Sequence, residues 1–174
     1  MSKISVLISK EAIETRIQEM ADKINREYEG QEVHLIGILK GSVFFVCELA
    51  KRLTIPVTMD FMSVSSYGAG TESTGRVKIV MDLSESIKGQ NVIIVEDIID
   101  SGNTLSYLMP LLSGREPASI RLITLLDKPE RRQKEVPVDD TGFTIPDAFV
   151  VGYGLDYAQK YRNLPYIGVI DPEA

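Results

Sequence analysis

Three carboxylates and a turn of small residues fall within nine residues near the middle of the chain. Glu96, Asp97 and Asp100 follow an apolar run over residues 92–95, and the turn spans residues 100–104. A carboxylate accepts several hydrogen bonds, so this group suits sugar hydroxyls or a hydrated metal ion, but not a phosphate of like charge. These residues predict a site for a sugar or a metal ion.

The turn itself has the composition of a phosphate site. Ser101 and Thr104 carry hydroxyls that can donate hydrogen bonds, and Gly102 permits backbone angles closed to other residues. A helix predicted to begin near Asn103 would present free backbone amides, which favour an anion. A phosphate next to sugar-binding carboxylates indicates a ribose 5-phosphate.

The elements around the turn place it at the edge of a sheet. Residues 92–95 are β-branched and apolar without alternation, which is typical of a strand covered on both faces in a parallel sheet. Such strands carry ligand chemistry at their carboxyl ends. Leucines at positions 105, 108, 111 and 112 recur at helical spacing, so we expect a helix that ends before Gly114.

A purely structural interpretation is also open for this stretch: a buried strand, a solvated turn and a helix capped by Asp100. Three carboxylates beside a Ser-Gly-x-Thr turn exceed what a strand and a cap need, which favours a ligand site. The spacing matches neither the GxxxxGK[ST] loop of nucleoside triphosphate sites nor the GxGxxG of dinucleotide sites.

The rest of the chain alternates helical and extended patterns. Ser9 is predicted to cap a helix that reaches Tyr28 and stops at Gly30. We expect another helix at 42–53, a charged link at 128–140, and strands at 33–39, 57–64, 78–83, 119–126, 148–153 and 166–170. Strands that alternate with helices in the first two thirds predict an α/β fold with a parallel sheet.

Composition indicates a soluble globular protein. At 174 residues, 44% hydrophobic and 25% charged, the chain fits one domain over residues 1–174. The net charge of −6 argues against broad attraction to nucleic acid or anionic membranes. The single cysteine, Cys47, excludes an intramolecular disulfide, and His34 is interpreted as a core histidine with satisfied hydrogen bonds. With no signal peptide and no long apolar segment, we expect a cytoplasmic protein.

The stretch VIIVEDIIDSGNT, residues 92–104, resembles the phosphoribosyl pyrophosphate signature of the type I phosphoribosyltransferases. Other segments resemble the bacterial hypoxanthine-guanine members: Leu-Lys-Gly at 39–41, Ser-Ser-Tyr at 65–67, Leu-Asp-Lys at 126–128 and FVVGYGLDY at 149–157. The resemblance implies a central, mostly parallel sheet flanked by helices. It also implies a small hood formed by the N- and C-terminal segments and a mobile active-site loop.

The resemblance further implies a reaction. The 5-phosphoribosyl group of phosphoribosyl pyrophosphate would pass to N9 of hypoxanthine or guanine, giving IMP or GMP and pyrophosphate, with Mg²⁺ as cofactor. Asp100 would be the acid-base group near the purine N7. Glu96 and Asp97 would hold the ribose hydroxyls or the metal shell, and Asp156 would coordinate Mg²⁺ on the pyrophosphate. A homodimer or homotetramer is implied as well.

The resemblance assigns the remaining donor contacts. Lys40 and Gly41, a pair that can adopt a non-proline cis peptide, would contact the pyrophosphate together with Arg162. Ser66 and Tyr67 would close over the reacting centre, because water would capture an oxocarbenium-like transition state. The residues implied in binding the 5-phosphate are Ser101, Gly102, Asn103 and Thr104. Some family members carry a lysine at the third of these positions, so binding here would depend on amides and hydroxyls.

Three residues are implied in reading the purine. Lys128 would meet its exocyclic oxygen, where a cation distinguishes a 6-oxo group from the 6-amino group of adenine. Phe149 would stack on the base, and Val150 would meet the base edge through its backbone. Without the resemblance, Lys128 and Arg162 are ordinary surface residues and Phe149 an ordinary core residue.

The charged link after residue 126 has a simpler interpretation. Asp127, Arg131, Arg132 and Lys134 are taken as solvated, with Arg132 also able to approach the pyrophosphate or to support Lys128.

Two other functions are compatible with the signature strand. A phosphoribosyltransferase for xanthine, adenine or a pyrimidine would differ in the base-reading residues, and Lys128 with Phe149 and Val150 favours a 6-oxopurine. A regulator that senses phosphoribosyl pyrophosphate and binds RNA or DNA would carry a basic face or an added domain. An acidic chain of this length shows neither.

Overall fold

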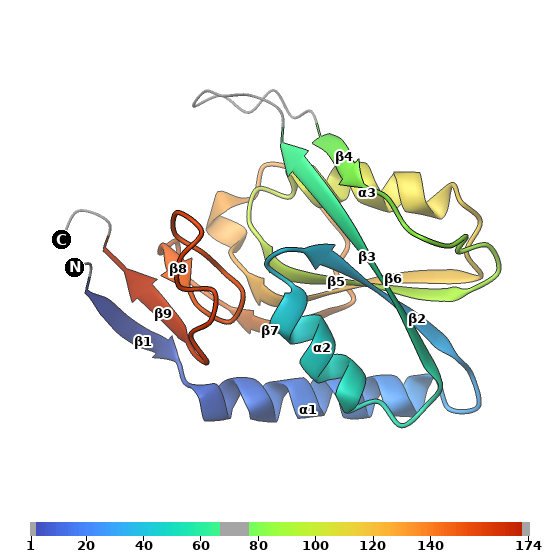
Figure 1. Cartoon of the computed structure of the whole chain (residues 1–174), viewed down its shortest axis with the longest axis horizontal. Coiled ribbons are helices and arrows are strands. Elements are labelled where there is room, and N and C mark those ends of the chain that lie inside the picture. Colours follow the sequence, from blue (N-terminus) through green and yellow to red (C-terminus); the bar gives the residue numbers. More distant parts are fainter. Residues whose placement is uncertain (1–2, 67–76, 172–174) are drawn as a thin grey trace.

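In the computed structural model, which describes residues 3–66 and 77–171, six strands form a central sheet in the order β4-β3-β2-β5-β6-β7 (Figure 1). In chain order they are β2 (Val33–Leu39), β3 (Val57–Ser66), β4 (Val77–Met81), β5 (Asn91–Ile99), β6 (Ser119–Asp127) and β7 (Asp140–Thr144). Neighbours run parallel except β3 and β4, which pair antiparallel. The expected α/β fold with a mostly parallel sheet is confirmed.

Helices cover both faces of this sheet. α1 (Lys10–Glu27) and α2 (Val43–Lys51) pack on one face over one hydrophobic cluster, and α3 (Asn103–Ser113) packs on the other over a second cluster (Figure 1). The predicted ends of the first helix are present. Ser9 Oγ accepts a hydrogen bond from the Ala12 amide (3.1 Å), and Gly30 has φ of 77°. No helix in the described part of the chain could cross a membrane.

The signature strand β5 is buried as predicted, and it is longer than its apolar run. Residues 92–95 are at most 1% exposed, and their side chains alternate between the two hydrophobic clusters. The strand continues to Ile99, which pairs with Asp127 of β6. Glu96 and Asp97 are therefore strand residues. Their backbone is fixed by the sheet, so the two carboxylates start from defined positions.

Among the described residues, three short strands form the expected hood at the two ends of the chain. β1 (Ile4–Ile8), β9 (Ile167–Ile170) and β8 (Val150–Val151) form an antiparallel sheet beside the central one (Figure 1). Ile8 and Ile167 belong to the cluster beneath α1 and α2, so the hood packs on the same core. The one-domain organisation stays a prediction.

Four elements differ from the sequence-based expectation. β1 and β7 were not predicted, and the strand expected at 148–153 shrinks to the two residues of β8. A single turn of 3₁₀ helix, Pro129–Arg131, follows β6 in the charged link. This turn brings the link back toward the end of β5, where the site lies.

Candidate active site

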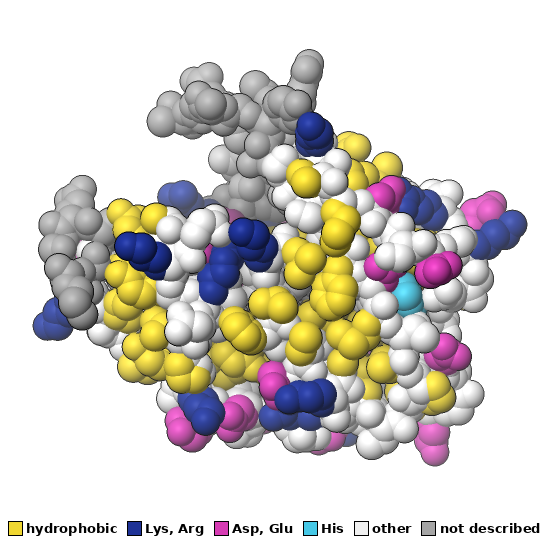
Figure 2. Space-filling model, in the orientation of Figure 1, with side chains coloured by type: hydrophobic (Ala, Val, Ile, Leu, Met, Phe, Trp, Pro, Cys, Tyr) yellow, Lys and Arg dark blue, Asp and Glu magenta, His cyan; other side chains and the backbone are white. Residues whose placement is uncertain are grey.

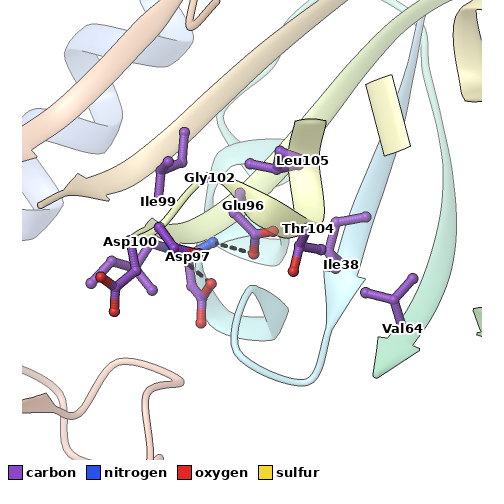
Figure 3. A pocket seen from close by; sticks show the side chains of 11 residues that line it. Ile38, Val64, Glu96, Asp97, Ile99, Asp100, Gly102, Thr104 and Leu105 are labelled. Atoms are coloured by element: carbon purple, nitrogen blue, oxygen red, sulfur yellow. Dashed lines mark hydrogen bonds between the residues drawn. The ribbon is translucent and has the colours of Figure 1, made fainter. Parts of the chain in front are cut away.

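A pocket of about 240 Å³ lies at the carboxyl end of β5, and we call it the signature pocket (Figure 3). Its lining comes from β2, β3, β5, the following turn and the start of α3. The lining residues are Ile38, Val64, Glu96, Asp97, Ile98, Ile99, Asp100, Ser101, Gly102, Thr104 and Leu105. The pocket therefore brings together most of the site residues predicted from the signature.

Glu96 and Asp97 are held in different ways. Glu96 is 7% exposed, and burial together with the adjacent Asp97 carboxylate raises the pKa of Glu96 well above its usual range. Its Oε1 accepts a hydrogen bond from the Asp97 amide (3.0 Å). The Asp97 side chain lies against Gly41, where an added β-carbon would stand 1.7 Å from Asp97 Oδ2. Position 41 therefore has room for glycine alone while Asp97 keeps this position.

The turn after β2 is enclosed between β5 and a later loop. From the later loop, a β-carbon on Gly154 would stand 1.9 Å from the carbonyl oxygen of Gly41. Gly154 has φ of 101°, which side-chain-bearing residues rarely adopt. A non-proline cis peptide is present here, but it joins Leu39 to Lys40. The cis bond thus lies one peptide before the Lys40–Gly41 pair that the resemblance named as able to adopt it.

Two cations predicted to bind pyrophosphate meet at Gln159. Its Oε1 accepts hydrogen bonds from Lys40 Nζ (3.2 Å) and from Arg162 Nη2 (3.0 Å). Arg162 also donates to the carbonyl of Gly154 (2.7 Å) and pairs with Asp156 Oδ1 (3.4 Å). This arrangement gathers positive charge beside the turn that carries Gly41, where an anion would be stabilised.

The three carboxylates predicted as metal ligands do not form one cluster. Within residues 3–66 and 77–171, no group of three or more His, Cys, Asp or Glu side chains could hold a metal ion. Asp156 is held by the amide of Gln159 (2.9 Å) and by Arg162, whereas Glu96 and Asp97 lie on β5. Separate carboxylates still fit Mg²⁺, because this ion is usually bound through one or two carboxylates together with substrate phosphates.

The turn at residues 100–104 folds around Gly102. This glycine has φ of 83° and is the N-cap of α3, so Asp100 is not the helix cap considered from the sequence. In the described part of the chain, the amides of Ser101 and Gly102 donate to no acceptor. Together with Thr104, whose side chain lines the pocket, these amides can bind an anion.

Asn103 does not line the signature pocket. Its Nδ2 donates to Gln133 Oε1 (3.2 Å), and its amide donates to Ser101 Oγ (3.3 Å). The assignment of Asn103 to the 5-phosphate site stays a prediction. The side chain connects α3 to the charged link.

A second pocket of about 330 Å³, which we call the Lys128 pocket, adjoins the end of β6 and the hood. The lining residues are Ile98, Asp100, Lys128, Arg131, Asp147, Ala148, Phe149, Val150 and Leu155. The residues predicted to read a base, Lys128, Phe149 and Val150, thus share one pocket. Phe149 is 47% exposed and meets the Tyr157 ring edge-on, with ring centroids 5.6 Å apart, so part of its surface is open to a ligand.

Lys128 is buried, with only 7% of the residue exposed. Its backbone amide donates to the carbonyl of Ile99 (3.0 Å), which fixes it beside the end of β5. No described residue accepts a hydrogen bond from its Nζ or forms an ion pair with it. The interpretation as an ordinary surface lysine is wrong, because most of the residue is buried while its ammonium has no described partner and can meet a ligand acceptor in the Lys128 pocket.

Asp100 is the titratable residue that both pockets share, and Ile98 lines both as well. Asp100 Oδ1 lies 3.5 Å from Arg131 Nε, and Arg131 also pairs with Asp147 (3.8 Å). Ligands in the two pockets would therefore meet beside the Asp100 carboxylate.

Comparison with known proteins identifies the family. Residues 7–158 match the phosphoribosyl transferase domain. The chain belongs to the phosphoribosyltransferase family. It is 52% identical over 167 residues to the hypoxanthine-guanine phosphoribosyltransferase of Bacillus subtilis. The aligned residues cover 96% of this chain and 93% of that relative. The hypoxanthine-guanine branch indicated by the sequence segments is thereby confirmed.

Two further relatives define the extent of the likeness. The chain is also 52% identical over 168 residues to a bifunctional protein TilS/HprT of Listeria monocytogenes, but it spans only 26% of that protein's length. A crystal structure of a hypoxanthine phosphoribosyltransferase from Staphylococcus aureus aligns with a TM-score of 0.93 and 47% identity, over 97% of this chain and 92% of that one. The type I phosphoribosyltransferase fold is thus confirmed.

In this phosphoribosyltransferase the charged link is not solvated at Asp127 and Arg132. Their side chains are 20% and 14% exposed and form an ion pair. Arg132 Nε also donates to the carbonyl of Asp100 (3.1 Å). This ion pair was not predicted from the sequence, although a carboxylate at a strand end and an arginine five residues later were a possible signal.

Ser66 and Tyr67, predicted to close over the reacting centre, lie where the described chain ends before residue 67. Ser66 is the last residue of β3 and pairs with Val77 of β4, while Tyr67 lies outside the described residues. The roles of Ser66 and Tyr67 stay predictions.

Only one of the two ring nitrogens of His34 has a hydrogen-bond partner among the described residues. Its Nδ1 lies 2.7 Å from Thr58 Oγ1, but its Nε2 is buried without a partner among the described residues. Burial lowers the pKa of His34, and the Asp60 and Glu32 carboxylates oppose this effect. The expectation of a fully satisfied histidine is wrong at Nε2.

Proposed function

We propose that the protein transfers the 5-phosphoribosyl group of phosphoribosyl pyrophosphate to N9 of hypoxanthine or guanine, releasing pyrophosphate and IMP or GMP. The observation that carries this proposal is that Asp100 and Ile98 line both pockets. A sugar phosphate in the signature pocket and a purine in the Lys128 pocket would bring the anomeric carbon and N9 together at this boundary. Such positioning alone lowers the barrier of a two-substrate reaction.

The donor is proposed to bind through its phosphates and its ribose. The free amides of Ser101 and Gly102 and the Thr104 hydroxyl suit the 5-phosphate. Glu96 and Asp97 line the same pocket and would accept hydrogen bonds from the ribose hydroxyls.

The pyrophosphate is proposed to bind beside the turn at Gly41. Lys40 and Arg162 both reach Gln159 there, and either can exchange that amide oxygen for a phosphate oxygen. Mg²⁺ held by Asp97, Asp156 or Glu96 would neutralise charge on the departing pyrophosphate.

Lys128 is proposed to select a 6-oxopurine. Its ammonium, which has no partner among the described residues, would gain a hydrogen-bond acceptor from the exocyclic oxygen of hypoxanthine or guanine. The 6-amino group of adenine would instead place donor against donor. Phe149 would stack on the base, and Val150 would meet its edge through backbone groups.

Asp100 is proposed to exchange the proton at N7 as N9 bonds to the anomeric carbon. Its carboxylate lies at the boundary of the two pockets, 3.5 Å from Arg131 Nε, within reach of a base bound in the Lys128 pocket. Ser66 and Tyr67 are proposed, from the family resemblance alone, to exclude water during this step.

A homodimer or homotetramer belongs to the same proposal. Hydrophobic side chains form a band across the face seen in Figure 2, and Phe44 on α2 and Met59 on β3 are 40% and 39% exposed. Exposed apolar surface of this kind favours association with a second copy. Sedimentation velocity at several concentrations tests this part, and a monomer at all of them would exclude it.

The test of the function is a comparison of acceptor bases. The purified protein is incubated with phosphoribosyl pyrophosphate, Mg²⁺ and hypoxanthine, guanine, xanthine, adenine or uracil, and nucleotide formation is followed. We expect product from hypoxanthine or guanine. Product from adenine or uracil alone would overturn the role of Lys128, and omission of Mg²⁺ with EDTA should abolish turnover.

A further inference from the structure

Residues of the charged link donate hydrogen bonds to carbonyl groups of the turn at residues 100–104. The carbonyl of Asp100 accepts a hydrogen bond from Arg132 Nε (3.1 Å). The carbonyl of Ser101 accepts two more, from the amides of Gln133 (2.8 Å) and Lys134 (3.0 Å). Two successive carbonyls of the turn therefore point toward the link.

Peptide geometry then determines where the next two amides point. In a planar trans peptide the carbonyl and the following N–H point in opposite directions. With the carbonyls of Asp100 and Ser101 bound to the link, the amides of Ser101 and Gly102 point away from it. These are the two amides that donate to no acceptor in the described chain, and both residues line the signature pocket.

The link is packed tightly enough to hold this orientation. A β-carbon on Gly102 would stand 2.3 Å from the carbonyl oxygen of Lys134 and 3.0 Å from Arg132 Cδ. Arg132 is itself fixed by its ion pair with Asp127 at the end of β6. One guanidinium thus joins a rigid strand to the turn, which its planar fork of donors allows.

We propose that Arg132, anchored by Asp127, is a positioning residue that orients the amides of Ser101 and Gly102 for the 5-phosphate. This role rests on the proposed function, because it assumes that the turn binds the phosphate of a nucleotide. Arg132 acts through the backbone of the turn. Its loss therefore reduces what the 5-phosphate contributes to nucleotide binding and leaves recognition of the base unchanged.

The experiment compares inhibition constants of GMP and guanosine, which differ only in the 5-phosphate. The guanosine constant divided by the GMP constant measures how much the phosphate contributes to binding, and we call this quotient the ratio. In Arg132→Gln we expect this ratio to fall about tenfold, the equivalent of one charge-assisted hydrogen bond. The guanosine constant itself should stay within about twofold, since the Lys128 pocket is unchanged.

Arg16 provides a matched control. Its Nε donates to the carbonyl of Gly142 (3.0 Å) and its Nη2 pairs with Asp140 (3.2 Å), the same two kinds of contact, but between α1 and β7. Arg16→Gln should therefore leave the ratio at the wild-type value. Asp127→Ala should lower the ratio, and adding it to Arg132→Gln should lower it little further, because both act through one interaction.

Arg132→Lys distinguishes orientation from charge. One ammonium cannot hold the Asp100 carbonyl and Asp127 as the guanidinium does, so the ratio should stay low. A wild-type ratio in Arg132→Gln, or full recovery in Arg132→Lys, would overturn the positioning role. If the wild-type protein forms nucleotide from no base and binds GMP no better than guanosine, the proposed function fails and this role fails with it.

Discussion

Gly41 and Asp97 are in direct contact: a β-carbon on Gly41 would stand 1.7 Å from Asp97 Oδ2. The contact joins the turn after β2, which carries Lys40, to the strand that carries the site carboxylates. The proposed pyrophosphate and ribose contacts are therefore fixed relative to each other by one glycine.

Replacing Gly41 with alanine should displace Asp97 and reduce turnover. A shift of about 1 Å in a positioned group can cost about 10²-fold in rate, and we expect a loss of kcat/KM of that order. Gly114→Ala is the control, because its nearest neighbour would lie 3.4 Å away and its φ is −67°. Near-normal kinetics in Gly41→Ala would show that the Asp97 position is not critical.

Lys128→Met should reduce turnover while leaving stability nearly unchanged. Methionine fills a similar volume, and no described residue pairs with the Lys128 ammonium, so we expect Tm to stay within about 2 °C of wild type. The kcat/KM for hypoxanthine should fall at least about 10²-fold. Calorimetry and steady-state kinetics measure both effects, with Lys88→Met at an exposed ion pair as control. A lower Tm would show that Lys128 stabilises the unliganded fold.

His34 should lower the free energy of unfolding at acidic pH. Because burial lowers its pKa in the folded chain, the unfolded chain takes up the proton first as pH falls. The contribution of His34 is present above about pH 6.5 and is lost as pH falls through the lower folded-state pKa. It is the only histidine in the sequence. Urea unfolding between pH 7.5 and 5 should show a weaker pH dependence in His34→Gln, and an unchanged dependence would refute this account.

Local patterns predicted the elements that carry the site. The apolar run of β5, the glycine at position 102 and the leucine spacing of α3 are set by neighbouring residues, so they were readable from the sequence. β1 was not, because its pairing partner Ile170 lies at the other end of the chain from Ile4. β7 is short and polar, and its strand character depends on pairing with β6.

The contacts between site segments were the least predictable part. The pairing of Asp127 with Arg132 requires the turn of 3₁₀ helix at Pro129–Arg131, and a run of charges normally indicates solvation. The burial of Lys128 likewise depends on the hood, which the sequence patterns do not place. The roles of residues were thus predictable where they depend on sequence neighbours. Their contact partners elsewhere in the fold were not.

The most direct test of the account is the steady-state kinetics of Asp100→Asn with hypoxanthine and phosphoribosyl pyrophosphate. Asparagine keeps the size of the side chain at the boundary of the two pockets but cannot exchange the proton at N7. We predict that kcat falls about 10²–10⁴-fold while the KM for the donor stays within about threefold. Asp82→Asn, which breaks an ion pair with Arg115 outside both pockets, should be unaffected. Near-normal kcat in Asp100→Asn would contradict the proposed mechanism.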